Sequence, residues 1–234
     1  MKYYPIQLDV REKKCLIIGG GSVGTRKAAT LINCGAKVTI VSPEITDVIE
    51  SMSTDGMIQL QKREYQSSDI HGMFLVIGAT NNEILNRQIS NDAQEHNIPC
   101  NIVDRPELCS FILPAIVEQG DLTITISTSG QSPAFAKHLR RELEKQFGHE
   151  YAIFLKCMGE IRKYVLNSNL ELNTHQHIFE TVIQRGLLDL IRQHQYTEIN
   201  TLLHDLHIEL DSKTLIELNI GENYQPTRKP SKAF

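Results

Sequence analysis

Short apolar runs alternate with helical patterns through the first 110 residues or so of the chain. Cys15–Ile18 is continuously apolar and is followed by glycines, which is typical of a strand buried on both faces of a parallel sheet. Four further strands are expected at Lys37–Val41, Met57–Gln61, Phe74–Ile77 and Ile98–Val103. Two helices are expected between them, at Thr25–Cys34 and at Ile84–His96, the second with Ile84, Leu85, Ile89 and Ala93 on its buried side. This alternation predicts an α/β fold with a Rossmann-type doubly wound parallel sheet.

The pattern changes near Pro114. Leu122–Ser127 alternates apolar with hydroxyl residues, which indicates a strand with one solvent-facing side, and a helix at Ala134–Phe147 is expected to follow it. From Glu150 onward the pattern is helical, with two apolar stripes. The first stripe is Ile153, Phe154, Cys157, Ile161 and Val165, and the second is Phe179, Val182, Ile183, Leu187, Leu190 and Ile191. A small α+β segment and a C-terminal helical domain are therefore predicted after the sheet.

Composition limits the classes of protein to consider. The chain is 41% hydrophobic and 22% charged, as expected for a folded globular protein, and its net charge of −4 gives no electrostatic reason to expect nucleic acid as a partner. The five cysteines are scattered without a CxxC pair, so they indicate neither a disulfide framework nor a thiolate zinc site. No signal-peptide pattern or apolar run of membrane-spanning length is present. We expect a soluble, cytoplasmic protein that does not associate with membranes.

The glycine-rich segment that follows the first strand satisfies the pattern G-x-G-x-x-G. In this context Gly19 makes the tight turn, Gly21 lets the backbone approach a pyrophosphate, and Gly24 lets the helix pack against the strand. The amides of Ser22 and Val23 would then point at the anion from the helix N-terminus. A dinucleotide site is predicted, and the alternative is a glycine-rich turn that binds nothing.

Two further strand ends fit the same cofactor. Glu44 lies 20 residues beyond Gly24, in the position of the acid that bonds the adenosine ribose, and an acid there favours NAD because it repels a 2′-phosphate. Ser42 is nearer the end of the strand and is the alternative ribose partner. Ala79 and Thr80 follow the next strand, where small residues let a cofactor lie against the sheet edge, although they could equally form an ordinary turn.

Several blocks of sequence along residues 1–150 occur together in one order. They are Tyr4–Ile6, Cys15–Ala28, Val41–Glu44, Ala79–Asn81, Cys100–Asp104, Ser110–Pro114 and Ile126–Pro133. In these blocks the chain resembles the siroheme synthase N-terminal family, whose members are precorrin-2 dehydrogenases and in some cases also sirohydrochlorin ferrochelatases. The resemblance weakens through the helical remainder.

The resemblance implies NAD-dependent oxidation of precorrin-2 to sirohydrochlorin in siroheme biosynthesis. It also implies a homodimer, formed by the segment after Pro114. Carried over residue by residue, Ser22 and Val23 match the family's pyrophosphate contact, Pro43 and Glu44 its adenosine contact, and Asp104 its essential acid. We therefore expect three parts: an NAD-binding Rossmann domain at 1–113, a dimerisation segment at 114–149, and a helical domain at 150–234 that ends in a flexible basic tail.

Asp104 follows a strand, beside the expected cofactor cleft. A carboxylate there is well placed to accept the proton released in dehydrogenation, and it could also take pyrrole protons during metal insertion. The alternative is a turn or capping residue before Arg105 and Pro106. The implied substrate carries eight carboxylates, so cations are expected around it. The expected cations are Arg105, Lys137, Arg140 and Arg141, although a charged helix face is also compatible with simple solvation.

Three other features shape the expected function. The pairs His175/His177 and His204/His207 lack the spacing and carboxylate partners of a metal site, so no metal site is predicted. Some family members carry a phosphorylatable serine where this chain has Thr128, which leaves such regulation open. The chain shows no pattern of the methyltransferase module that some relatives carry, so no methylation is expected. The alternatives to a simple dehydrogenase are a bifunctional enzyme that also inserts Fe²⁺ and a non-catalytic NAD-sensing regulator.

Overall fold

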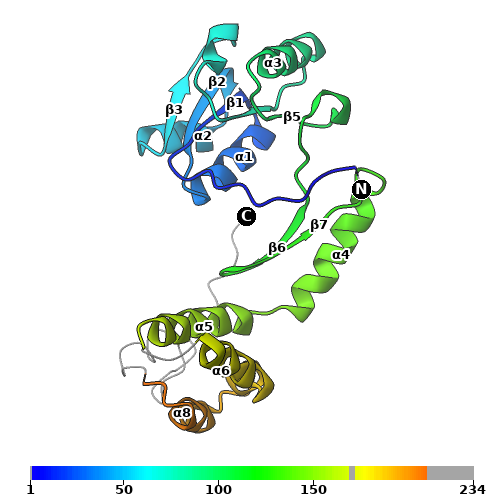
Figure 1. The fold of residues 1–234 in the computed structure, drawn as a ribbon. Helices are drawn as coiled ribbons and strands as arrows, with labels where there is room; N and C mark the ends of the chain where they lie inside the picture. Colours follow the sequence, from blue (N-terminus) through cyan, green and yellow to red (C-terminus); the bar gives the residue numbers. More distant parts are fainter. Residues whose placement is uncertain (1, 169–171, 210–234) are drawn as a thin grey trace. The chain divides into compact units, whose positions relative to one another are not determined.

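The computed structural model describes residues 2–168 and 172–209. The chain divides into two compact units, Met1–Leu113 and the remainder from Pro114 (Figure 1). We describe each unit by itself. The further division at residues 149 and 150 stays a prediction, and the expected tail at 225–234 lies outside the described residues.

The first unit is built on a five-stranded parallel sheet, which confirms the predicted α/β fold. The strands are β1 (Lys14–Gly20), β2 (Lys37–Ile45), β3 (Ile58–Gln61), β4 (Leu75–Gly78) and β5 (Cys100–Ile102), in the order β3-β2-β1-β4-β5. The helices are α1 (Ser22–Asn33), α2 (Asp47–Thr54) and α3 (Glu83–Glu95), with short 3₁₀ turns at Ser67–Ile70 and Pro106–Leu108. The strand order reverses between β1 and β4, and in doubly wound sheets ligands bind at that point.

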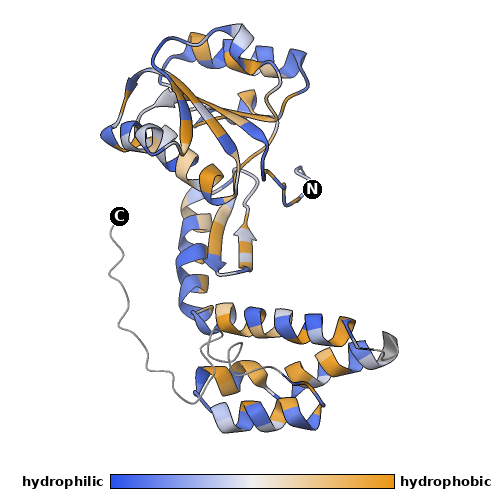
Figure 2. Ribbon diagram, turned by 90° about the vertical axis from the view of Figure 1, so that its left-hand side faces the viewer, coloured by the Kyte–Doolittle hydropathy of each residue, from blue (hydrophilic) through white to orange (hydrophobic). Residues whose placement is uncertain are grey.

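The continuous apolar run of β1 is explained by burial on both of its faces. Cys15 and Ile17 pack on one face with Ala28 of α1, whereas Leu16 and Ile18 pack on the other with Ile89 of α3. All four strand side chains are at most 3% exposed. In Figure 2 the strands are accordingly coloured as hydrophobic, between helices that are hydrophobic only on their inner sides.

Two expectations for this unit were wrong. Ile84, predicted on the buried side of its helix, is 82% exposed, because it points to the side of α3 opposite to the buried Asn86, Ile89 and Ala93. The strand predicted at Lys37–Val41 continues to Ile45, through Ser42 and Pro43. Pro43 is tolerated there because β2 bends away from its partner at the end of β1, where the register shifts.

The second unit begins with a hairpin of β6 (Ala115–Gln119) and β7 (Leu122–Ile126), which turns at Gly120 with a positive φ of 59°. The helices are α4 (Pro133–Gln146), α5 (Glu150–Leu166), α6 (Leu172–Gln184), α7 (Leu187–Arg192) and α8 (Tyr196–Asp205). Val117 is fully buried on the side of the hairpin that α4 covers. Strand β6 escaped the sequence analysis because its residues alternate too little to indicate a strand.

A separate apolar core joins the helices of the second unit. Cys157, Ile161 and Val165 of α5 are fully buried, as their stripe predicts, and they pack with Val182 of α6 and Leu187 of α7. Ile183 was predicted in the same core, but it is 59% exposed. It follows Val182 directly on α6, about 100° further round the helix, and this turns it away from the core that buries Val182.

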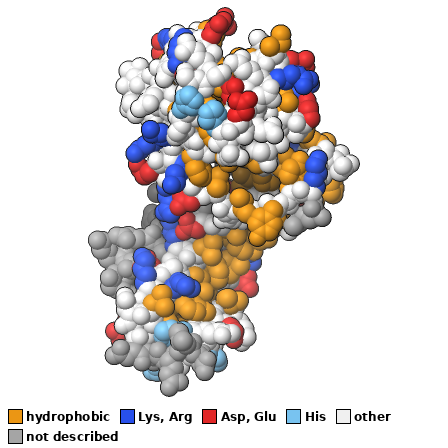
Figure 3. Space-filling model, turned by 45° about the horizontal axis from the view of Figure 1, so that its top comes forward, with side chains coloured by type: hydrophobic (Ala, Val, Ile, Leu, Met, Phe, Trp, Pro, Cys, Tyr) orange, Lys and Arg blue, Asp and Glu red, His pale blue; other side chains and the backbone are white. Residues whose placement is uncertain are grey.

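The surface carries charges of both signs. Figure 3 shows basic and acidic side chains interspersed over the face of the first unit that it draws. Several are paired: Lys37 with Glu12 at 2.6 Å, and Lys62 with Glu50 at 2.7 Å. Among the described residues, no helix has both the length and the apolar character needed to cross a membrane.

Candidate cofactor cleft at the carboxyl edge of the sheet

The turn from β1 into α1 is closed by backbone contacts that leave no space for side chains. Gly19 has a φ of +110°, and a Cβ on it would lie well inside 3.0 Å of the carbonyl oxygen of Ala79. A Cβ on Gly24 would overlap the carbonyl oxygen of Gly19 in the same way. The turn therefore brings α1 and the end of β4 within backbone contact of β1, and only glycine permits both approaches.

Gly21 has the opposite surroundings. Nothing in the described structure lies within 4 Å of the position its Cβ would take, and its φ of −75° suits any residue. Gly21 is also the N-cap of α1, where no side chain bonds the first amides of the helix. Open space beside unbonded helix amides fits a pyrophosphate, which the amides of Ser22 and Val23 would hold.

At the end of β2, the side chain of Ser42 is committed to the backbone. Its buried hydroxyl accepts a hydrogen bond from the Gly20 amide at 2.9 Å and donates one to the Glu44 carbonyl at 2.5 Å. The hydroxyl thus ties β2 to the glycine turn, which argues against Ser42 as the ribose partner. Pro43 and the Glu44 carboxylate are exposed at this strand end, where an adenosine ribose would lie.

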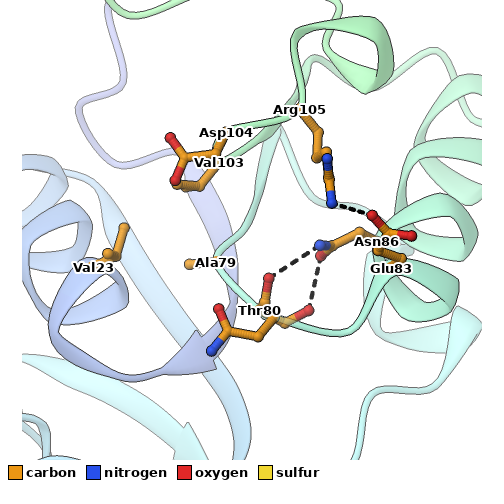
Figure 4. A pocket seen from close by; sticks show the side chains of 9 residues that line it. Val23, Ala79, Thr80, Glu83, Asn86, Val103, Asp104 and Arg105 are labelled. Carbon is orange, nitrogen blue, oxygen red and sulfur yellow. Dashed lines mark hydrogen bonds and ion pairs between the residues drawn. The ribbon is translucent and has the colours of Figure 1, made fainter.

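A cavity of about 300 Å³ opens on the other side of the strand-order reversal (Figure 4). It is lined from four elements, namely the start of α1, the end of β4, the start of α3 and the end of β5. Five predicted site residues meet there: Val23, Ala79, Thr80, Asp104 and Arg105. Their roles in binding stay predictions, but residues up to 82 positions apart in the sequence share this one cavity.

Asp104 lies in the loop that leaves β5, with its backbone in the left-handed region at φ 59°. Short-range bonds fix that loop: Val103 N donates to Gly78 O at 2.9 Å, and Arg105 N donates to Ile102 O at 3.2 Å. Aspartate tolerates this conformation better than most residues. The alternative role as a helix cap is not favoured, since Arg105, and not Asp104, is the N-cap of the following 3₁₀ turn. Its exposed carboxylate is therefore available to a ligand in the cavity.

Two charged residues near Asp104, namely Glu83 and Lys27, were missed by the sequence analysis. Arg105 forms an ion pair with Glu83, the first residue of α3, and the pair spans one side of the cavity (Figure 4). Lys27 is half-buried on α1, and burial lowers the pKa of its ammonium group, reinforced by the Arg26 charge and opposed by the charge of Asp104. Its signal in the sequence was the spacing of four residues from Val23, which places both side chains on one helix face.

Asn86 is a further missed residue of the cavity. It is 3% exposed on α3, and its side chain bonds both the hydroxyl and the carbonyl of Thr80. Its signal was a polar residue three positions before the buried Ile89, on the packed side of the helix.

The remaining predicted cations lie in the second unit. Lys137, Arg140 and Arg141 are all on α4, where Arg140 pairs with Glu144 of the same helix. Since the units are described separately, contact of these residues with a substrate stays a prediction. Thr128 accepts a hydrogen bond from the Ser132 amide at 3.1 Å, just before α4. Within residues 2–168 and 172–209 no group of three or more histidine, cysteine or acidic residues is arranged to hold a metal ion.

Comparison with known families agrees with the two-unit architecture. Residues 6–115 match a family described as "Putative NAD(P)-binding", and residues 119–146 match "Sirohaem biosynthesis protein central". The chain is 30% identical over 224 residues to a siroheme synthase of Vesicomyosocius okutanii, covering 96% of this chain and 47% of that protein. It is 36% identical over 188 residues to a siroheme synthase of Methylobacillus flagellatus, covering 80% and 40%. The chain thus spans about half the length of the curated relatives it matches.

A solved structure described as "SirC, precorrin-2 dehydrogenase" has a similar fold. The two chains superpose with a TM-score of 0.73 at 21% sequence identity, covering 88% of this chain and 99% of that one. At this identity the likeness establishes the fold, which extends across both units.

Proposed function

The chain belongs to the siroheme synthase N-terminal family, and on that premise we propose that it is an NAD-dependent precorrin-2 dehydrogenase that produces sirohydrochlorin for siroheme biosynthesis. One observation carries the proposal. The cavity beyond the glycine turn brings together Val23 at the pyrophosphate end, Thr80 on the sheet edge and the exposed carboxylate of Asp104. A cofactor-binding turn and a proton acceptor in one cleft are the requirements of a dehydrogenase.

Different residues of the first unit contact different parts of the cofactor. The amides of Ser22 and Val23 hold the pyrophosphate, and Pro43 and Glu44 contact the adenosine. Gly19, Gly21 and Gly24 keep the turn close to the cofactor, while Ala79 lies against its middle and Thr80 lies where the middle leads into the nicotinamide half. The negative charge of Glu44 favours NAD over NADP because it repels a 2′-phosphate. Bound NAD supplies the acceptor for the hydride that leaves the substrate.

Asp104 takes the proton that accompanies hydride loss. Its carboxylate accepts no hydrogen bond from other described residues, so a lone pair is free to accept the proton that the substrate releases. The fixed loop around it holds the carboxylate at the cavity wall. A positioned general base contributes about 10²- to 10⁴-fold to rate. A pure NAD sensor would need no acid at this place, which is why we prefer the enzyme.

Cations of the chain bind the substrate carboxylates. Arg105 is next to the base and its guanidinium can pair with a carboxylate through two hydrogen bonds. Lys137, Arg140 and Arg141 of α4 serve the same purpose in the proposed homodimer, which the segment 114–149 forms. Exposed Ile116 of β6 and Phe135 of α4 offer an apolar surface for a second copy. The five free cysteines fit the cytoplasm.

The direct test is anaerobic incubation of the purified protein with precorrin-2 and NAD. We expect NADH absorbance to rise in step with the spectrum of sirohydrochlorin. Absence of NADH at every pH tried, with substrate shown to be intact, contradicts the dehydrogenase. Light scattering of the same preparation tests the homodimer separately, and a monomer at micromolar concentration argues against it.

The role of Asp104 gives a sharper prediction. Asp104→Asn keeps the shape of the side chain and its tolerance of the left-handed backbone but removes the base. We expect kcat to fall about 10²-fold or more, with the dissociation constant of NADH unchanged. Normal turnover in this variant excludes Asp104 as the base.

Iron insertion is a second candidate function, because an exposed carboxylate beside the substrate can also accept pyrrole protons. The ferrous ion would then be a substrate. Adding Fe²⁺ to sirohydrochlorin without NAD tests it. A siroheme spectrum that depends on Asp104 supports the bifunctional enzyme. If iron is inserted no faster than without the protein, dehydrogenation is the only activity that remains proposed.

A further inference from the structure

The buried amide of Asn86 controls the shape of the cavity wall at the end of β4. Its Oδ1 accepts a hydrogen bond from the Thr80 hydroxyl at 2.8 Å, and its Nδ2 donates to the Thr80 carbonyl at 3.0 Å. The Asn86 side chain thereby binds both the hydroxyl and the carbonyl of Thr80. Figure 4 shows the two interactions as dashed lines between Thr80 and Asn86.

These bonds leave Thr80 one orientation. Its hydroxyl donates to Asn86 and also accepts from the Asn82 amide at 3.2 Å, so neither rotation about its side chain nor a flip of its peptide is free. Asn86 is held in turn by burial: it is 3% exposed in the wall of α3 that faces the sheet. A buried amide that lost these partners would have unsatisfied polar atoms, so the two hydrogen bonds between Asn86 and Thr80 are expected to form or break together.

The position of Thr80 relative to the strand-order reversal defines which part of a dinucleotide it meets. Glu44 and the adenosine-binding end lie on the β2 side, and the pyrophosphate lies over the glycine turn. The β4 side, which includes Thr80 and leads to Asp104, is left for the nicotinamide half. Asn86 lines the same cavity but is only 3% exposed, so it acts on this half through Thr80.

We propose that Asn86 is a positioning residue that orients Thr80 for the nicotinamide ring of the cofactor, without contacting the cofactor itself. Ser42 is its counterpart on the adenosine side, where a buried hydroxyl ties the Gly20 amide to the Glu44 carbonyl. The inference rests on the proposed function only in that the cleft binds a dinucleotide. It assigns the two buried polar residues to opposite halves of that ligand.

The test compares two probes by calorimetry: NADH, and ADP-ribose, which lacks the nicotinamide. Asn86→Leu keeps the branched shape of the side chain, in a somewhat larger volume, and removes both hydrogen bonds. We expect the dissociation constant of NADH to rise about tenfold and that of ADP-ribose to change less than twofold, since roughly a single good hydrogen-bonded contact is lost. Ser42→Ala is the matched control, and it should weaken both probes by the same factor.

A merely structural role predicts a different pattern. If Asn86→Leu weakens both probes equally, or neither, Asn86 does not act through the nicotinamide half and the proposal is wrong. If wild-type protein binds neither probe, the cofactor proposal itself fails, which the first titration reveals. Thr80→Val tests the same link from the Thr80 side, because it removes the hydroxyl but keeps the carbonyl that Asn86 also binds: adding Asn86→Leu to it should lower NADH affinity by a smaller factor than Asn86→Leu does in the wild type.

Circular dichroism of each variant checks that it folds. Should Asn86→Leu fail to fold, Asn86→Asp replaces it, because it keeps size and polarity but loses the donor to the Thr80 carbonyl. The same selectivity for NADH over ADP-ribose is then expected, and its absence overturns the proposal.

Discussion

The two sides of the cofactor cleft are built from different materials. On the β1–β2 side the cleft is formed mainly by backbone groups, since glycines at positions 19 and 24 let peptide groups meet where no Cβ fits. On the β4–β5 side the wall is made by side chains, namely Asn86 behind Thr80 and the Arg105–Glu83 pair beside Asp104. Gly19 and Gly24 on the first side therefore tolerate no side chain, whereas substitutions on the second side should have graded effects.

The difference also explains what the chemistry of each side needs. A pyrophosphate is common to all dinucleotides, and rigid amides at a helix end recognise it well. The substrate side must place a base and bind particular carboxylates, which requires side chains of chosen length and charge. A backbone-built side and a side-chain-built side thus divide general binding from specific chemistry.

The largest expected effect comes from a glycine pair on the backbone-built side. A Cβ on Gly24 would overlap the Gly19 carbonyl, which cannot move without breaking the turn, so Gly24→Ala should destabilise the first unit by about 2 kcal/mol or more and abolish NADH binding. Gly21→Ala meets nothing in the protein, so its melting temperature should match wild type. Its NADH affinity should nevertheless fall by about 10²-fold, because the methyl group occupies the pyrophosphate space.

Thermal unfolding and NADH fluorescence titration of the two variants separate these outcomes. Equal loss of stability in both would mean that the space beside Gly21 is not open. Unchanged NADH affinity in Gly21→Ala would remove the pyrophosphate from this turn.

An intermediate effect is expected at Glu44, the exposed acid on the same side. Glu44→Gln removes the charge that repels a 2′-phosphate, and it weakens the acceptor for the ribose hydroxyls. The ratio of NADPH to NADH affinity should rise about tenfold. Glu50→Gln is the matched control. Glu50 lies on α2 in an exposed ion pair with Lys62, and its substitution removes an equal charge. A similar shift in the control would mean that overall charge, and not Glu44, sets the preference.

The contrast between the two sides also shows why the sequence predicted one of them better. Gly19 and Gly24 were found because backbone contact leaves only one residue type and fixes its spacing. Asn86 looks like any polar helix residue until α3 is packed on the sheet, and Glu83 meets Arg105 across 22 positions that no local pattern connects. The sheet was predictable because Cys15–Ile18 must be buried on both faces. Ile84 and Ile183 were misplaced because apolar character alone does not say which side of a helix packs on the core.

The smallest expected effect is on the Arg105–Glu83 pair, the outermost part of the side-chain-built wall. Both side chains are well exposed, at 44% and 62%, so the pair adds no more than about 1 kcal/mol to stability and is screened by salt. The Glu83 carboxylate competes with a substrate carboxylate for the Arg105 guanidinium. Arg105 must therefore break or weaken its pair with Glu83 in order to bind the substrate. Glu83→Gln frees Arg105 and should lower KM for precorrin-2 about two- to threefold at low salt, with kcat unchanged.

Arg105→Gln should raise the same KM, and the difference between the two variants should shrink as salt is added, because both effects are electrostatic. Asp205→Asn is the control, as it breaks a comparable exposed pair with Arg185 in the helical unit. An unchanged KM in Glu83→Gln would mean that Arg105 stays with α3 during turnover. The wall beside Asp104 would then be as rigid as the glycine turn opposite, and the contrast between the two sides would hold for their construction but not for their response to substrate.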